Sequence, residues 1–198
     1  MRDQDVRLAV RAHLHSLHEG DSSTRIVEEM GIWSGAVRID IAVINGELSG
    51  FELKSDRDTL DRLPLQADYY SRVFDRLTLV VGTRHVEKAS VMLPDWWGIT
   101  VATGTDAGVT LAEMRLADRN PNIESYLLAQ LLWKEEALAV LEKYSLAKGW
   151  RSKPAKAIHE RLARELPHDA LSAEVRAGLK ARQEWLRQPV GNQRDMAV

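Results

Sequence analysis

The chain has 198 residues, 44% of them apolar and 28% charged, which is room for one packed domain with a small helical annex. It has no cysteine, which excludes disulfide scaffolds, cysteine nucleophiles and zinc or iron–sulfur sites held by cysteine. No apolar run approaches the ~20 residues that cross a bilayer, so we expect a cytoplasmic protein without a membrane partner. The net charge of −2 argues against a small nonspecific nucleic-acid binder but leaves room for an enzyme with one basic surface.

The N-terminal part of the chain changes from a helical to an extended pattern. Residues 3–18 carry apolar side chains at helical spacing, and a turn signal follows them. Three short segments rich in β-branched residues then predict strands at residues 24–30, 36–44 and 47–55. An Asn-Gly pair separates the last two segments and predicts a hairpin.

The next segments predict a crossover. A helix begins near Pro64, and its apolar stripe runs through Leu65, Tyr69, Val73 and Phe74. The near-continuous apolar run 77–82 fits an inner strand that is covered on both faces. This order predicts a parallel crossover beside the hairpin, and therefore a mixed sheet. A short helix and two further strands are expected at residues 85–92, 98–104 and 109–117.

After about residue 120 only helical periodicity remains, at residues 123–144, 154–166 and 170–188. Residues 143–187 hold 11 Lys or Arg and 5 Asp or Glu, so this part is basic while the rest of the chain is acidic. We therefore predict an α/β protein with two parts: a mixed β-sheet core flanked by helices, residues 1–118, and a basic helical extension packed on it, residues 119–198.

Charged residues interrupt two otherwise apolar strands. Glu52 and Lys54 alternate onto one face of the third predicted strand, and Asp40 lies on the second. An acid and a lysine two residues apart on a core-like strand are costly to desolvate unless they are paired or bind a metal. The alternative is a solvent-facing strand edge with an incidental ion pair.

The register of the hairpin decides whether Asp40 can meet Glu52. A two-residue Asn-Gly turn would direct Asp40 to the wrong face. A three-residue loop at residues 44–46, with Gly46 at positive φ in a bulge, instead places Asp40 opposite Gly50 and diagonal to Glu52. We predict this bulged register because it brings the carboxylates together. Replacement of Gly46 by Val should then be unfavourable.

Two carboxylates that share an ion beside a lysine suit the hydrolysis of a phosphodiester. Oxygen ligands favour Mg²⁺ or Mn²⁺ over zinc. Such an ion would polarise the phosphoryl group and lower the pKa of a bound water. Lys54 would hold that water, help to deprotonate it or offset the charge of the transition state.

Asp40 followed by Glu52-Leu53-Lys54 on a hairpin, then a crossover helix and an inner strand, resembles the PD-(D/E)XK nuclease superfamily. The first motif here reads Ile-Asp rather than Pro-Asp. The wider stretch 38–82 is similar to a small bacterial family of that superfamily. The resemblance implies a restriction-endonuclease-like fold. It also implies that the backbone carbonyl of Leu53 is a further metal ligand.

The resemblance extends to residues outside the central motif. One carboxylate of the pair Glu28-Glu29 would also bind the metal, and the family pattern favours Glu29; the alternative is an exposed edge carboxylate. Gln66 and Tyr70 are similar to the Gln-x-x-x-Tyr element of the RecB-like branch. Gln66 would orient Lys54, a metal-bound water or a phosphate, or it simply lies on a polar helix face. Tyr70 either packs in the core or hydrogen-bonds the site.

We expect a Mg²⁺- or Mn²⁺-dependent deoxyribonuclease of bacterial repair, restriction or mobile-element defence. Nucleic acid, DNA before RNA, is the expected partner, and a homodimer is left open. Arg38 either neutralises a phosphate or pairs with a carboxylate. Further phosphate contacts are expected from four basic residues: Lys148, Arg151, Lys153 and Lys156. The alternative is a catalytically dormant member that serves as a nucleic-acid-binding or protein-interaction module.

Overall fold

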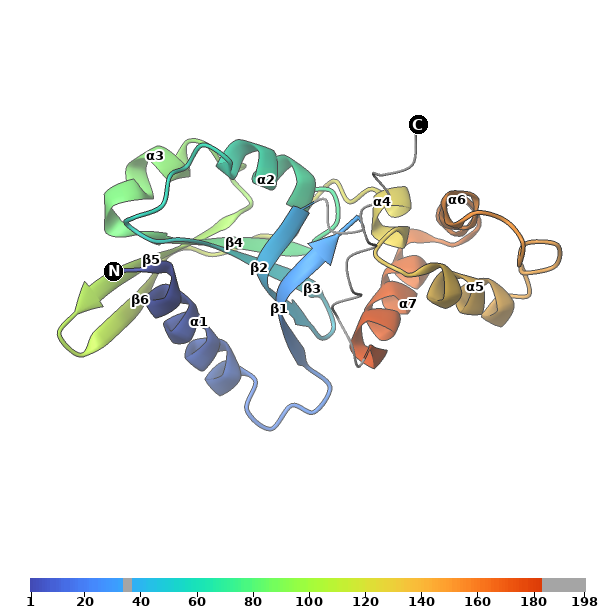
Figure 1. The fold of residues 1–198 in the computed structure, drawn as a ribbon, viewed down its shortest axis with the longest axis horizontal. Coiled ribbons are helices and arrows are strands. Elements are labelled where there is room, and N and C mark those ends of the chain that lie inside the picture. The colour runs from blue at the N-terminus through green and yellow to red at the C-terminus, as the bar shows by residue number, and fades with distance from the viewer. Residues whose placement is uncertain (34–36, 183–198) are drawn as a thin grey trace, which may run out of the picture.

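The computed structural model describes residues 1–33 and 37–182 and contains one six-stranded mixed sheet with helices on both faces (Figure 1). The strands lie in chain order across the sheet: β1 (Arg25–Ile32), β2 (Val37–Ile44), β3 (Leu48–Lys54), β4 (Arg76–Gly82), β5 (Gly98–Thr105) and β6 (Gly108–Arg115). β3, β4 and β5 are parallel to one another, and the other neighbours are antiparallel. The predicted α/β class, with a mixed sheet and a parallel crossover, is confirmed.

The helices are α1 (Asp3–Leu17), α2 (Leu63–Tyr70), α3 (Val86–Ser90), α4 (Ser125–Ala129), α5 (Lys134–Lys143), α6 (Ala155–Glu165) and α7 (His168–Ala181), with a 3-10 turn η1 (Thr83–His85) before α3. In Figure 1, α4 to α7 gather at one end of the sheet, and α1 and α2 lie on opposite sides of it. None of the helices in the described ranges has the length and apolar character that crossing a bilayer requires.

The helix predicted at residues 123–144 is two helices in the structure, since α4 ends at Ala129 and α5 begins at Lys134. Tertiary contacts explain the break. The carbonyl oxygen of Leu131 accepts a hydrogen bond from the Arg182 guanidinium at 2.5 Å, and Nε2 of His159 lies 3.0 Å from the carbonyl oxygen of Leu132. Side chains thus satisfy carbonyl groups that would bond within a continuous helix.

The crossover helix is also shorter than its apolar stripe suggested. It ends at Tyr70, so Val73 and Phe74 follow the helix, although both are buried. Leu65, which the stripe included, is 56% exposed. The last predicted helix corresponds to α7, and its residues beyond 182 lie outside the described part of the chain.

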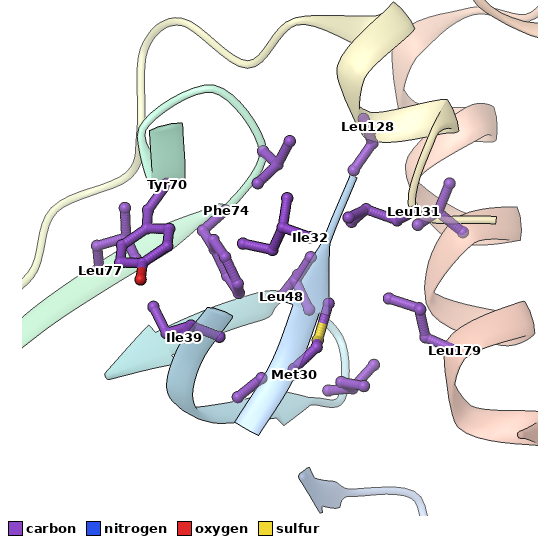
Figure 2. Packing of buried hydrophobic residues seen from close by; sticks show 14 of the residues in the cluster. Met30, Ile32, Ile39, Leu48, Tyr70, Phe74, Leu77, Leu128, Leu131 and Leu179 are labelled. Carbon is purple, nitrogen blue, oxygen red and sulfur yellow. The ribbon is translucent and has the colours of Figure 1, made fainter. Parts of the chain in front are cut away.

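Two hydrophobic clusters flank the sheet. The smaller joins α1 to β2, β3, β4 and β5 through Val6, Val10, Leu14, Ile41, Val43, Leu53, Val80 and Ala102. The larger lies under α2 and continues into the helical extension. Figure 2 shows side chains of Met30, Ile32 and Leu48 between Phe74 on one side and Leu131 and Leu179 on the other. The extension therefore shares its core with the sheet.

The alternation of side chains between the two faces of the sheet is interrupted at Glu29 in β1 and at Asp40 in β2. Ile39 belongs to the larger cluster and Ile41 to the smaller one, although residues two apart on a strand normally share a face. Opposite them Glu29 has φ 52°, an uncommon conformation for a residue other than glycine. Simple alternation, which would put Ile39 and Ile41 together on one apolar face, is therefore wrong here. The irregularity frees Asp40 to reach toward α1.

The loop between β2 and β3 differs from the predicted one. It comprises residues 45–47 and is closed by the pair Ile44 and Leu48. The Asn45 side chain accepts the N–H of Glu47 at 2.9 Å, and the N–H of Asn45 donates to the carbonyl oxygen of Glu47 at 3.1 Å. Because the asparagine side chain supports the loop, the glycine between them needs no positive φ and has none.

The predicted bulge and the positive φ at Gly46 are therefore wrong, and the register is shifted by two residues along β3. The last printed pair of β2 and β3 is Ile41 with Phe51. Continuing that register by one residue places Asp40 across from Glu52, whereas the predicted register placed it across from Gly50. The shift brings the two carboxylates closer to each other than the bulged hairpin would.

Gly50, rather than Gly46, is the hairpin glycine that the fold requires. A Cβ atom at Gly50 would lie 2.7 Å from Cδ2 of Leu77 and 2.8 Å from Cδ1 of Ile39, while nothing lies within 4 Å of one at Gly46. We expect Gly50→Val to lower the free energy of unfolding by about 1–3 kcal/mol through overpacking. Gly46→Val should change it by about 0.5 kcal/mol or less. Urea denaturation of the two variants measures the difference, and equal losses would contradict this assignment.

Candidate active site

Glu52 is the deeply buried acid of the hairpin, with 1% of its surface exposed. Its Oε1 accepts hydrogen bonds from Nζ of Lys54 and Nε2 of Gln66, each at 2.5 Å. Its Oε2 is buried, and within the described ranges no donor meets it in hydrogen-bond geometry. The Tyr70 hydroxyl lies close enough to act on the pKa of the carboxyl, but it donates to the carbonyl oxygen of Arg38. A carboxylate oxygen such as Oε2 is costly to bury alone, so the geometry suits a donor or a cation at this point. The alternative of a solvent-facing strand edge is wrong.

The surroundings of Glu52 disfavour its charge. Burial, and then the negative charge of Asp40, raise the pKa of Glu52 to about 7, while the positive charge of Lys54 opposes the shift. The carboxyl group is therefore partly protonated at neutral pH in the metal-free protein. A cation bound beside Oε2 would favour the carboxylate.

Asp40 lies where β2 and β3 separate. Its Oδ2 accepts the backbone N–H of Leu53 at 2.8 Å, and its Oδ1 accepts a hydrogen bond from the guanidinium of Arg7 at 2.7 Å. The N–H and C=O groups of one residue in an extended strand point to the same side. The carbonyl of Leu53 therefore faces the side of the strand on which Asp40 lies, as the expected ligand set requires.

Arg7, on α1, is the site residue that the sequence did not indicate. Besides Asp40 it lies 3.0 Å from Oε1 of Glu29, 3.5 Å from Oδ2 of Asp3 and 4.0 Å from Oε2 of Glu28. Its side chain is 18% exposed. An arginine on an amphipathic helix normally belongs to the solvated face, and only the fold brings this one to Asp40.

The acidic pair on β1 lies at the edge of the site. Glu29 approaches Arg7 more closely than Glu28 does, and Glu28 pairs instead with Arg11 at 3.0 Å. The Glu29 side chain is 45% exposed, with Arg38 3.6 Å from its Oε2. Arg38 was expected either to neutralise a phosphate or to pair with a carboxylate, and in the structure it lies beside the carboxylate of Glu29.

The crossover helix α2 turns its polar pair toward the hairpin. Tyr70 is fully buried in the larger cluster, and its hydroxyl donates to the carbonyl oxygen of Arg38 at 2.6 Å. Gln66 donates to Glu52, lies 3.4 Å from the Tyr70 hydroxyl and has a buried Oε1 without a partner in the described part of the chain. Gln66 is thus not on a merely polar helix face, and Tyr70 is both a core and a hydrogen-bonding residue. Burial raises the pKa of Tyr70, so its hydroxyl stays protonated.

The four predicted phosphate-binding residues are elsewhere. Lys148, Arg151 and Lys153 lie on the exposed loop between α5 and α6, and Lys156 lies in the first turn of α6. A cavity of about 440 Å³ in this loop is lined by Lys148 and Arg151 together with Ala147, Gly149 and Ser152. Figure 1 places the loop at the end of the extension that points away from the sheet. The structure does not bring these residues to the hairpin site.

The donor set fits a hard divalent cation. Across residues 1–33 and 37–182, no three histidine or acidic side chains converge as a ready metal cluster. A metal would be held by Asp40, Glu52 and the carbonyl of Leu53, with water completing its shell. These are oxygen ligands of the kind that Mg²⁺ and Mn²⁺ take. Glu29, the fourth predicted ligand, instead faces Arg7 and Arg38. The unpartnered Oε2 of Glu52 fits this set, whereas Oδ1 of Asp40 already faces Arg7.

Comparisons with known proteins assign the family. The chain belongs to the family of bacteriophage P4 protein cII, whose sequence profile matches residues 1–194. Protein cII of Enterobacteria phage P4 is 25% identical over 146 residues, which are 74% of this chain and 55% of the relative, so the chain spans about half of that protein. A solved structure, the SPO1766 protein of unknown function from Silicibacter pomeroyi, is 20% identical, with a TM-score of 0.45, and the match covers 78% of this chain and 98% of that one.

Proposed function

We propose that this member of the phage P4 cII family is a nuclease that uses Mg²⁺ or Mn²⁺ to hydrolyse phosphodiester bonds, with DNA as its substrate in the cytoplasm. One observation carries the proposal: within the described ranges Oε2 of Glu52 is buried without a hydrogen-bond partner, while Lys54 holds the other oxygen of the same carboxyl group. A purely structural ion pair would satisfy both oxygens of a buried carboxylate. The PD-(D/E)XK resemblance of the same residues gives the proposal its reaction type.

Each group has a task in this reaction. When bound, the divalent ion supplies Lewis acidity toward a phosphoryl oxygen and makes a coordinated water more acidic. Gln66 and Lys54 fix Oε1 of Glu52, which leaves Oε2 to the ligand. The ammonium of Lys54, whose side chain is 12% exposed, can also donate to the attacking water or offset charge that develops on the phosphate.

A second candidate function, the dormant binding module, is favoured by the two contacts that Asp40 makes. Both oxygens of Asp40 already have partners, because Oδ1 accepts from Arg7 and Oδ2 from the N–H of Leu53. A protein that never binds metal would need such partners permanently. The two candidates therefore differ in whether a divalent ion can enter the site.

An activity panel tests the proposal. The purified chain is incubated with Mg²⁺ or Mn²⁺ and with single-stranded, double-stranded and branched DNA and RNA, beside Lys54→Ala and a chelator control. We expect metal-dependent cleavage of DNA that Lys54→Ala and the chelator remove. Binding without cleavage of every substrate would favour the dormant module, and cleavage that survives Lys54→Ala would point to a contaminating nuclease or another site.

The basic residues between α5 and the first turn of α6 lead to a separate prediction about DNA binding. If Lys148, Arg151, Lys153 and Lys156 contact phosphates, the affinity for DNA should fall steeply with salt, by about 0.7–0.9 in the log–log slope for each contact. A variant with all four changed to Gln should show a slope flatter by up to about 3, with its metal affinity unchanged. Fluorescence anisotropy at several salt concentrations measures this. An unchanged slope would assign these charges to the solvated surface.

A further inference from the structure

The guanidinium of Arg7 lies against Oδ1 of Asp40, one of the two carboxylates of the proposed metal site. It donates to Oδ1 of Asp40 at 2.7 Å and to the backbone carbonyl oxygen of the same residue at 3.2 Å, and it lies 3.0 Å from Oε1 of Glu29. Oδ2 of Asp40 already accepts the N–H of Leu53 at 2.8 Å, so each oxygen of this carboxylate has a partner. A divalent ion bound to Asp40 and this guanidinium would repel each other and compete for the same carboxylate.

The helix that carries Arg7 is fixed, but the side chain has other partners. Val6, Val10 and Leu14 anchor α1 in the smaller cluster under the sheet. Asp3, one turn earlier on the same helix, lies 3.5 Å from Nε of Arg7, and Glu28 lies 4.0 Å from its Nη1. Asp3 therefore offers the guanidinium a carboxylate partner other than Asp40.

We infer that Arg7 is a positioning residue. Its guanidinium binds Asp40 until a metal ion displaces it, and this competition sets the affinity with which the ion binds. The inference rests on the proposed function, since it presupposes a metal site at Asp40 and Glu52. In the metal-free protein the arginine neutralises Asp40 and Glu29. When the ion binds, Arg7 moves to Asp3, while Glu28 stays paired with Arg11.

The direction of the effect distinguishes this role from a structural one. If Arg7 competes with the ion, removing its charge should tighten metal binding. If Arg7 only supports the shape of the site, removing it should loosen Asp40 and weaken metal binding. Arg11 is the matched control, because it lies one turn later on α1 and pairs with Glu28 at 3.0 Å without touching Asp40.

The experiment is a calorimetric titration of Mn²⁺ into the full chain and its variants. Arg7→Met should bind Mn²⁺ at least about 10-fold more tightly than the parent protein, and Arg11→Met should stay within about 2-fold. Arg7→Lys keeps the charge but loses the two-pronged contact, so it should fall between the parent and Arg7→Met. Unchanged or weaker binding by Arg7→Met would overturn the inference. If Arg7→Met does not fold, Arg7→Lys decides, and a Kd equal to that of the parent would overturn it.

A second readout separates this inference from the proposed function. At the same Mn²⁺ concentration, the rise in Tm should be larger for Arg7→Met than for the parent. The variant is expected to have the lower Kd, and the stabilisation by a ligand grows with the ratio of its concentration to Kd. If no protein in the series binds Mn²⁺, the metal site and the inference both fall. If the parent binds Mn²⁺ and loses it in Asp40→Asn, while Arg7→Met is unchanged, only the inference falls.

Discussion

Glu52→Gln should lower the rate of phosphodiester cleavage by at least about 1000-fold, equivalent to about 4 kcal/mol of transition-state stabilisation. Glutamine has the shape of glutamate and can keep the contacts to Lys54 and Gln66, which both meet Oε1. With the amide oxygen in the place of Oε1, its NH2 group takes the place of Oε2, and an amide NH2 donates hydrogen bonds and cannot bind a cation. The loss should therefore come from the metal site while the fold persists, and calorimetry should show Mn²⁺ binding weakened beyond about 10-fold.

Glu47→Gln is the control for this experiment. Glu47 lies in the loop of the same hairpin, but it is 38% exposed and pairs with Arg76 at 2.7 Å rather than with the site. Its replacement should leave both cleavage and metal affinity within about 2-fold of the parent protein. Similar activities for Glu52→Gln and Glu47→Gln would remove Glu52 from the mechanism.

In the presence of a chelator, the titration of Glu52 should lower the free energy of unfolding by about 3 kcal/mol as the pH rises from about 4.5 to about 7. Burial and the nearby charge of Asp40 raise the pKa of Glu52 from 4.5 to about 7 in the folded protein. Within that window the folded state binds more protons than the unfolded state, so raising the pH favours unfolding. Above about pH 7 the carboxyl is ionised in both states, and this contribution becomes constant.

Glu52→Gln should flatten this pH dependence, because an amide does not titrate. At pH 8 without metal the variant should then be more stable than the parent, although it is inactive. Mn²⁺ at 100 times the Kd of the parent should stabilise the parent by about 3 kcal/mol and the variant by about 1.4 kcal/mol or less. Urea denaturation between pH 4.5 and 8 measures both effects, and parallel pH profiles for the two proteins would exclude Glu52 as the titrating group.

The convergence of the central side chains was predictable because it depends on local spacing. Glu52 and Lys54 share a strand face at a separation of two, and Gln66 and Tyr70 share a helix face at a separation of four. The parallel crossover then places that helix over the hairpin. Asp40 was expected beside Glu52, and the structure brings it there by a different register.

The features that the sequence did not predict depend on contacts made by individual side chains, most of them between residues distant in the sequence. The hairpin register follows from the Asn45 side chain that closes the loop, and this contact cannot be told from a pattern of alternation. The helix break before Lys134 depends on bonds from Arg182 and His159, which are distant in sequence. Arg7 meets Asp40 only because α1 packs on the sheet, and no spacing in the chain indicates this.

The most direct test of the account is the position of the metal. Crystals grown with the Mn²⁺ concentration that supports cleavage would be measured for anomalous scattering by manganese. We predict one peak within about 2.0–2.4 Å of an oxygen of Asp40 and of Oε2 of Glu52, with Arg7 turned away from Asp40. No peak between these carboxylates, with the guanidinium of Arg7 still on Oδ1 of Asp40, would contradict it.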